Sequence, residues 1–310
     1  MEDLDPTLQE LIVEMASAGA PQLSSLSIEG ARDQFAQFMS TETTVGTIAG
    51  TRDYRIEGPD SPVQFRSYQP EGDGPHPVLL WLHGGAWMLG DIDLYDPLCR
   101  VLADEFDRVV VSVEYRLAPE HPFPAGLKDC YAALQWVSEQ SNTISGNAEQ
   151  IAVGGDSAGG NLAASLCLLA RDTDGPAIEQ QVLVYPVTSY PFTPSDDANR
   201  GYFLSVSDVE WSWSHYLSDQ IDGQNPYAAP LNARDLEELP PATVVTCKFD
   251  PIYREGTQYA RRLSDAAVPV THVHYDDVAH GFLALLEDPR VEQAWEAIRE
   301  IGSELEKSHA

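Results

Sequence analysis

The sequence is poor in basic residues, and above all in lysine. Its 310 residues include 18 Lys and Arg against 49 Asp and Glu, a net charge of −31, and only three lysines. Such a charge argues against nucleic acid and anionic membrane surfaces as partners, because both are negatively charged. The acidic residues are spread along the chain, so they do not indicate a disordered tail. This composition resembles that of proteins from salt-in halophiles, whose acidic surfaces hold hydrated cations; an acidic mesophilic protein is the alternative.

Patterned cysteines and long apolar runs are also missing. Cys99, Cys130, Cys167 and Cys247 show no CxxC spacing and lie in apolar or helix-like stretches, which predicts small buried thiols rather than disulfides. No apolar run approaches the roughly 20 residues that a membrane-spanning helix needs. Three of the first five residues are acidic, whereas a secretory signal peptide begins with basic residues. We therefore expect a soluble, cytoplasmic protein without a membrane partner.

Strand and helix patterns alternate along most of the chain. Two predicted strands, at 52–56 and 63–68, come first. After them, strand-like apolar runs alternate with amphipathic stretches: strands are predicted at 77–83, 108–115, 150–154, 180–185, 241–249 and 270–275, and helices at 95–105, 125–139, 157–171, 255–266 and 290–307. Such alternation predicts an α/β protein with a mainly parallel central sheet and helices on both of its faces.

Two regions fall outside this alternation. Residues 4–16 and 28–39 have the apolar spacing of amphipathic helices. About fifty residues rich in Pro, Asp, Ser and aromatic side chains separate two of the strands, and an insertion of that length is usually functional. We expect these regions to pack together as a helical cap. The predicted division is a cap at 1–45 and 190–235 and a core at 46–189 and 236–310.

The segment Gly155-Asp156-Ser157-Ala158-Gly159-Gly160 fits the pattern G-x-S-x-G. It lies between a predicted strand and a predicted helix, so Ser157 occupies a sharp strand-to-helix turn. Such a turn exposes the serine above the sheet on a strained backbone, and its glycines allow neighbouring backbone to approach closely. The helix N-terminus also favours developing negative charge. These features predict that Ser157 is a catalytic nucleophile.

A second turn of small residues, His83-Gly84-Gly85-Ala86-Trp87, follows an earlier predicted strand. Backbone amides in such a turn can point at a substrate oxygen and form an oxyanion hole. We expect the N–H groups of Gly85, Ala86 and Ala158 to be the donors and Gly84 to shape the turn. His83 is then an orienting hydrogen-bond partner rather than a base.

In hydrolases with such a serine turn, the acid and the base follow the serine in the chain. Among the aspartates between Ser157 and His280, only Asp250 directly follows a buried strand. His280 lies on a loop after a strand and is the candidate general base, with Asp250 setting its tautomer. His272 and His274 alternate within a predicted strand and share one face. They lack a third ligand at a suitable spacing for zinc, so we expect no metal.

These motifs give the sequence a resemblance to the hormone-sensitive-lipase-like family of α/β-hydrolase esterases, which has an HGGG-type oxyanion loop. The residues that carry it are His83–Trp87, Tyr115–Ala125, Gly155–Gly160, Asp250-Pro251, Glu255-Gly256 and His280-Gly281-Phe282. The resemblance implies the α/β-hydrolase fold, a two-part cap, a Ser–Asp–His triad and hydrolysis of esters with short or medium acyl chains. The stretch 115–125 has no catalytic chemistry of its own and is interpreted as packing near the site.

The sequence departs from this family at three places. Ala86 stands where the third glycine of the oxyanion loop is usual. Tyr253-Arg254 replaces the usual Arg-Asp, and Asp276-Asp277 replaces a glycine-containing turn before the histidine. The methyl group of Ala86 bears on the width of the site and on its turn. The other two departures bear on the local backbone geometry near Asp250 and His280 and not on the identity of the triad.

The function predicted from the sequence is that of a carboxylesterase that works through an acyl-enzyme on a small-molecule ester, without a cofactor. Two alternatives stay open: an amide or peptide hydrolase on the same fold, and a non-catalytic small-molecule receptor. Such receptors commonly lose the triad histidine, whereas His280 is present. The sequence does not identify the physiological ester, the stereochemical preference or the oligomeric state, for which a homodimer is one option.

The net charge of −31 predicts a protein whose stability and activity depend on salt. Like charges on one compact domain repel each other and destabilise the folded state in dilute buffer. At about 1 M salt the Debye length falls to about 3 Å, which screens most of this repulsion. We expect activity and unfolding temperature to rise from millimolar to molar KCl, with NaCl acting similarly at equal ionic strength. Equal activity and stability at both extremes would contradict the halophile interpretation.

Overall fold

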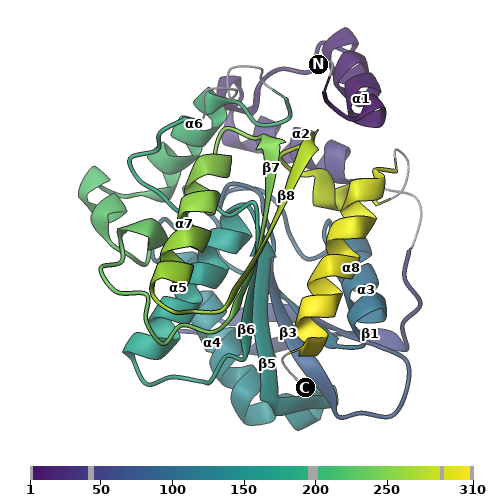
Figure 1. Cartoon of the computed structure of the whole chain (residues 1–310), viewed down its shortest axis with the longest axis vertical. Helices are drawn as coiled ribbons and strands as arrows, with labels where there is room; N and C mark the ends of the chain where they lie inside the picture. The colour runs from purple at the N-terminus through teal and green to yellow at the C-terminus, as the bar shows by residue number, and fades with distance from the viewer. Residues whose placement is uncertain (1–2, 41–44, 195–201, 287–289, 308–310) are drawn as a thin grey trace.

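A twisted, mainly parallel sheet forms the centre of the molecule (Figure 1). The computed structural model describes residues 3–40, 45–194, 202–286 and 290–307. The strand order is β1-β2-β4-β3-β5-β6-β7-β8; β1 and β4 pair antiparallel with β2, and the other pairs are parallel. The strands are β1 Gly50–Ile56, β2 Val63–Gln69, β3 His76–Leu82, β4 Val109–Glu114, β5 Gly146–Asp156, β6 Gln180–Val184, β7 Ala242–Phe249 and β8 Val270–Ala279.

Helices cover both faces of this sheet, as the alternating sequence pattern predicts. The helices are α1 Pro6–Ser17, α2 Ile28–Met39, α3 Asp96–Phe106, α4 Ala125–Gln140, α5 Ala158–Asp172, α6 Val206–Tyr216, α7 Tyr253–Asp265 and α8 Glu292–Lys307. Helices α3 and α8 lie on one face, and α4, α5 and α7 lie on the other (Figure 1). Helices α1, α2 and α6 gather beyond the carboxyl ends of β7 and β8 (Figure 1).

Strand β3 shows why helices must bury both faces of the sheet. Val78, Leu80 and Leu82 belong to one buried apolar cluster, and Leu79 and Trp81 belong to the other. All five side chains are fully buried. Because successive side chains of a strand point to opposite faces, a strand that is apolar at every position must be covered twice.

Strand β8 is longer than the sequence predicts, and Asp276-Asp277 lies inside it rather than in a turn. The strand forms the edge of the sheet, where polar side chains can reach solvent. Gln293 donates to the carboxylate of Asp277 at 2.7 Å, and the amide of Asp5 donates to its carbonyl at 2.7 Å. The two acidic residues are therefore accommodated within an extended strand that continues to Ala279.

The N-terminal region contacts the long insertion between β6 and β7. The amide of Ser24 donates to Asp208 at 2.8 Å, and the hydroxyls of Ser24 and Ser207 lie 3.3 Å apart. Ser205 caps the N-terminus of α6 through a hydrogen bond from the amide of Asp208. Residues 41–44 and 195–201 of the expected cap lie outside the described residues.

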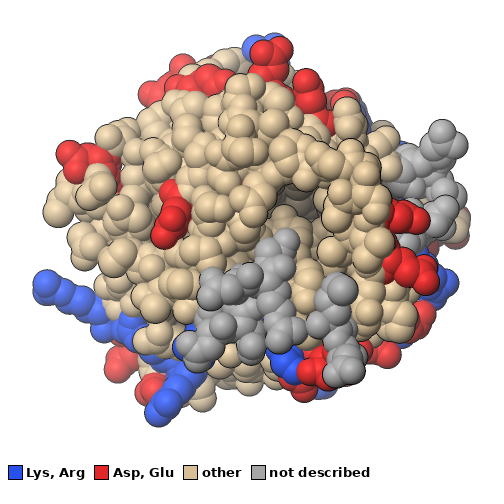
Figure 2. Space-filling model, turned by 90° about the horizontal axis from the view of Figure 1, so that it is seen from above, with Lys and Arg blue, Asp and Glu red and all other residues tan. Residues whose placement is uncertain are grey.

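The four cysteines are free and buried, which confirms the interpretation of small buried thiols. In the part of the chain that the structure describes, no helix is long and apolar enough to cross a membrane. Viewed from above, charged side chains lie mainly around the periphery of the molecule, and the hollow near the centre of this face has an uncharged described border (Figure 2).

The stretch 115–125 connects several elements, which agrees with its interpretation as packing near the site. The backbone amide and Nε of Arg116 donate to Asp129 Oδ2 at 2.9 and 2.8 Å, and Nη2 donates to Oδ1 at 2.9 Å. The amide of Phe123 donates to the carbonyl of Tyr216 in α6 at 2.7 Å. This stretch therefore joins the end of β4 to α4 and to the cap.

Replacing Asp129 tests this junction. Asp129 is 1% exposed and accepts three hydrogen bonds from Arg116, whose other carboxylate partner, Asp60, is exposed. Asp129→Ala removes three hydrogen bonds from the mostly buried Arg116 and leaves it only the exposed Asp60 as a carboxylate partner, so it should lower the unfolding free energy by about 3 kcal/mol. Asp60→Ala should lower it by less than about 1 kcal/mol, because the pair is solvated. Equal losses in urea titrations would contradict the assignment.

Candidate active site

The carboxyl ends of three parallel strands bring the predicted site residues together. Ser157 directly follows β5, Asp250 directly follows β7, and His280 directly follows β8. Strands that run in parallel place their carboxyl ends at one edge of the sheet, where ligands of open α/β sheets bind. Residues up to 123 positions apart in the sequence therefore meet at one place.

Ser157, His280 and Asp250 form a continuous chain of polar contacts. His280 Nε2 lies 2.9 Å from Ser157 Oγ, and His280 Nδ1 lies 2.8 Å from Asp250 Oδ2. Asp250 is 1% exposed, and its Oδ1 accepts a hydrogen bond from the amide of Ile252 at 2.9 Å. The aspartate thus holds a proton on Nδ1, which leaves Nε2 able to take the proton of the serine hydroxyl.

The backbone at Ser157 is strained, as expected for an exposed nucleophile. Its φ of 55° and ψ of −116° are unfavourable for a residue with a side chain. A Cβ on Gly159 would lie 1.8 Å from the carbonyl oxygen of Leu82, and a Cβ on Gly155 would lie 2.4 Å from the same oxygen. Both glycines are therefore needed for the close approach of this turn to the end of β3.

The loop after β3, residues 83–87, also has an unusual backbone. Gly85 has a φ of 110°, and a Cβ there would lie 2.2 Å from the carbonyl oxygen of Leu89. Ala86 and Trp87 have φ values of 56° and 59°, which explains why glycine is usual at the position of Ala86. Gly85 and Ala86 line the cavity that contains Ser157. Within the described part of the chain, the amides of Gly85, Ala86 and Ala158 donate no hydrogen bond to another protein group.

His83 lies behind this loop and is fully buried. Its Nδ1 donates to the carbonyl of Gly84 at 2.7 Å, and its ring stacks on Tyr115 with centroids 4.3 Å apart. The hydroxyl of Tyr115 donates to the carbonyl of His83 at 2.8 Å. Burial lowers the pKa of His83 to about 4, so the ring is neutral near pH 7. These contacts suit an orienting group rather than a base.

A small apolar cavity of about 130 Å³ surrounds Ser157 and His280. Met15, Phe35, Phe38 and Phe203 line it from the expected cap segments. A larger cavity of about 390 Å³ adjoins it and shares the walls formed by Met15, Gln34, Phe38, Met39 and Ala284.

Three other apolar residues of the cap segments, Leu11, Tyr202 and Trp211, do not line this small cavity. Leu11 lines only the larger cavity. Tyr202 instead packs against Phe249 with ring centroids 5.6 Å apart, and Trp211 packs against His215 at 5.0 Å. Helical spacing alone could not show which aromatic side chains of the insertion face the site.

His272 and His274 face a threonine rather than a candidate metal centre. Their ring nitrogens each lie 2.8 Å from Thr246 Oγ1, and His274 also packs against Tyr253, the first residue of α7. In the described ranges, no group of three or more His, Cys, Asp or Glu side chains could hold a metal ion. His309, the last histidine, lies outside the described residues.

Two buried carboxyl groups near the site were not predicted from the sequence as site residues. Asp156 accepts hydrogen bonds from the amide of Gly84 at 3.1 Å and from the hydroxyl of Tyr95 at 2.9 Å, and burial raises its pKa to about 6. Glu255 accepts from the amides of Thr188 and Ser189 at 2.7 and 3.3 Å, and burial raises its pKa to about 8. The available signals were the place of Asp156 directly before Ser157 and the place of Glu255 in the Glu255-Gly256 motif that the family resemblance includes.

The raised pKa of Glu255 predicts a pH-dependent loss of stability. Because the pKa in the folded state lies above that in the unfolded state, this group contributes its full stability at low pH and loses it as pH rises through about 8. In Glu255→Gln the side chain stays neutral at every pH. The unfolding temperature of this variant, relative to that of wild type, should therefore increase as pH rises from about 5 to about 9. The exposed Glu210→Gln is the control. A constant difference for Glu255→Gln across this range would contradict the prediction.

Comparison with known proteins places this geometry among ester hydrolases. The carboxylic ester hydrolase LipN of Mycobacterium tuberculosis is 37% identical over 92% of this chain and 78% of its own length. An arylesterase of Saccharolobus solfataricus is 34% identical over 90% of this chain and 92% of its own length. The solved esterase of Pyrobaculum calidifontis superimposes with a TM-score of 0.91 at 34% identity, over 98% of both chains.

The family model agrees with these relatives. A model described as the α/β-hydrolase fold matches residues 79–284, which include the second half of β3, the serine turn and the candidate acid and base. The sheet order, the strand-to-helix turn at Ser157 and the hydrogen-bonded Ser–His–Asp chain are features of that fold. The chain belongs to the α/β-hydrolase family.

Proposed function

We propose that the protein is a carboxylesterase that hydrolyses short- to medium-chain esters through an acyl-enzyme on Ser157. The observation that carries this proposal is the chain of contacts from Ser157 Oγ through His280 to Asp250, at 2.9 and 2.8 Å. His280 takes the hydroxyl proton as Ser157 attacks the ester carbonyl and returns it to the leaving alkoxide. Water then attacks the acyl-enzyme with His280 as general base, which releases the acid.

Backbone amides are proposed to stabilise the oxyanion. Gly85 and Ala86 line the cavity beside Ser157, and Ala158 is the first residue of α5. Amides at a helix N-terminus have no partner within the helix, and the helix dipole favours negative charge there. Donors fixed in this way stabilise the charge that develops on the carbonyl oxygen without reorganising during the reaction.

The alternatives receive less support. The relatives reported above carry names of ester hydrolases, which favours ester over amide substrates. A non-catalytic receptor has no need for a complete Ser–His–Asp chain with hydrogen-bonding distances. Rates on p-nitrophenyl esters and on the matching anilides distinguish an ester hydrolase from an amide hydrolase. Labelling of Ser157 by a fluorophosphonate distinguishes either enzyme from a non-catalytic receptor.

Substitution of the three proposed triad residues tests the mechanism. Ser157→Ala and His280→Ala should each lower kcat on p-nitrophenyl butyrate by about 10⁴-fold or more, because each removes the nucleophile or its base. Asp250→Asn should lower kcat somewhat less, since it disturbs the tautomer and orientation of His280. Circular dichroism and unfolding temperature serve as checks of the fold. Turnover near that of wild type in His280→Ala would remove the assignment of the base.

The cap segments 1–45 and 190–235 are proposed to limit the acyl chain. The cavity at Ser157 is small and adjoins the larger one that Leu11 lines. Cavities of this size suit esters with short to medium acyl chains better than esters with long chains. Faster hydrolysis of long-chain triglyceride emulsions than of soluble short-chain esters would contradict this proposal.

Two substitutions on α1 test which cavity holds the end of the chain. Leu11→Trp fills the larger cavity, whereas Val13→Trp introduces the same side chain at a position that is 52% exposed. Each methylene that loses its apolar burial costs about fourfold in kcat/KM. Leu11→Trp should therefore lower kcat/KM for octanoate esters but not for acetate esters, and Val13→Trp should leave the ratio unchanged. An equal effect of both variants would contradict the role of the larger cavity.

We also propose that the protein works at high salt in a cytoplasm. The net charge of −31 with only three lysines supports this proposal. The acidic residues would hold water and hydrated cations at the surface, while the border of the central hollow is uncharged where it is described (Figure 2). The charged side chains thus lie away from the hollow through which we propose that the substrate enters. Salt then screens mainly the repulsion between charges at the periphery.

A further inference from the structure

Tyr95 and Asp156 connect the two segments that form the proposed active site, without belonging to the Ser–His–Asp chain. Asp156 directly precedes Ser157, and its Oδ2 accepts a hydrogen bond from the Tyr95 hydroxyl at 2.9 Å. Its Oδ1 accepts from the amide of Gly84 in the oxyanion loop, residues 83–87, at 3.1 Å. Tyr95 is 2% exposed and Asp156 is 5% exposed. A single buried carboxylate thus joins the serine turn to the oxyanion loop.

Gly84, Asp156 and Tyr95 are packed closely together. A Cβ on Gly84 would lie 2.4 Å from Asp156 Oδ2 and 2.8 Å from the Tyr95 hydroxyl oxygen. Glycine is therefore the residue that allows the amide at position 84 to approach the carboxylate. The position of the loop depends on this contact, because Gly85 and Ala86, which line the cavity at Ser157, follow Gly84 directly.

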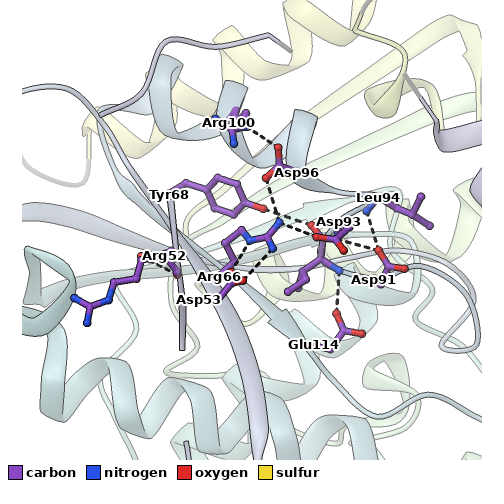
Figure 3. Close-up of polar contacts among 12 residues, drawn as sticks. Arg52, Asp53, Arg66, Tyr68, Asp91, Asp93, Leu94, Asp96, Arg100 and Glu114 are labelled. Atoms are coloured by element: carbon purple, nitrogen blue, oxygen red, sulfur yellow. Dashed lines mark hydrogen bonds and ion pairs between the residues drawn. The ribbon is translucent and has the colours of Figure 1, made fainter. Parts of the chain in front are cut away.

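The segment before Tyr95 is fixed from the outer side of the molecule (Figure 3). The guanidinium of Arg66 contacts Asp93 at 2.8 Å and Asp96 at 3.4 Å, on either side of Tyr95. Glu114 accepts from the amide of Ile92 at 2.9 Å. These contacts hold the backbone that carries Tyr95, so its hydroxyl is presented to Asp156 from a supported segment.

We propose that the Tyr95–Asp156 pair is a positioning device that holds the oxyanion loop against the serine turn, so that the amides of Gly85 and Ala86 keep their distance from Ser157 while the oxyanion forms. The proposal rests on the proposed esterase function. Tyr95 and Asp156 are positioning residues, because they act through Gly84 and not on the reacting atoms. Burial raises the pKa of Asp156 to about 6, and the two donors favour its charged form near pH 7.

A loosened oxyanion loop should affect turnover more than binding. The amides interact with the charge that develops in the transition state, and loss of one such donor lowers kcat by about 10²- to 10³-fold in a serine hydrolase. Displacement of the donors, with the donors retained, should have a smaller effect. The expected signature is a lower kcat at a nearly unchanged KM.

Tyr95→Phe tests the proposal with the loss of one oxygen atom. The matched control is Tyr259→Phe, because Tyr259 is equally buried and its hydroxyl has no hydrogen-bond partner among the described residues. Tyr95→Phe should lower kcat on p-nitrophenyl acetate about tenfold, with KM within about twofold of wild type. The rate at which a fluorophosphonate labels Ser157 should fall in parallel, since its phosphoryl oxygen uses the same amides. Tyr259→Phe should leave kcat, KM and the labelling rate unchanged.

A second series keeps the proposal testable if a substitution weakens the fold. Asp156→Asn retains one oxygen that can accept from Gly84, and Asp156→Ala retains none, so kcat should fall in the order wild type, Asn, Ala. Unfolding temperatures are measured for every variant. A kcat for Tyr95→Phe equal to that of Tyr259→Phe would overturn the positioning role, whatever its stability. Wild-type protein that neither hydrolyses esters nor labels at Ser157 would overturn the esterase function itself, and this proposal with it.

Discussion

The close approach of the serine turn to the end of β3 is the contact on which the proposed active site depends. The carbonyl oxygen of Leu82 leaves no room for a Cβ on either Gly155 or Gly159. This contact brings the N-terminus of α5 next to the loop 83–87, so that amides from two separate segments can serve one oxygen atom. It also forces Ser157 into an unfavourable φ, which the surrounding packing must stabilise.

Acidic groups have two different roles in this molecule. Most of them lie at the surface, where their mutual repulsion depends on salt. Asp156, Asp250 and Glu255 are buried near the serine, and each accepts hydrogen bonds from named donors. A buried carboxylate without such donors would be costly, so each of these side chains fixes the segment that supplies them. These hydrogen bonds fix the loop 83–87, the loop after β7 and the residues after β6.

Much of the fold and the candidate site could be predicted from the sequence, because the relevant signals are local. A strand apolar at every position predicts two covered faces, and β3 has them. Ser157 is identified by its strand-to-helix turn, and Asp250 and His280 are identified by their places after later strands. Parallel strands end at one edge of the sheet, which is why these three places meet. The strand predicted at 270–275 continues to Ala279 through Asp276-Asp277, because an edge strand tolerates polar side chains and its pairing with β7 resumes at Phe249.

The sequence by itself determined the α/β class, the serine turn and the order of the candidate catalytic residues, since each depends on neighbours along the chain. Only the tertiary structure decided which cap side chains reach the cavity: Phe38 and Phe203 do, whereas Tyr202 and Trp211 pack elsewhere. It also decided that Asp156 meets Gly84, a partner 72 positions away. Contacts at such separation depend on how the sheet orders and twists its strands, and no periodicity along the chain records that arrangement.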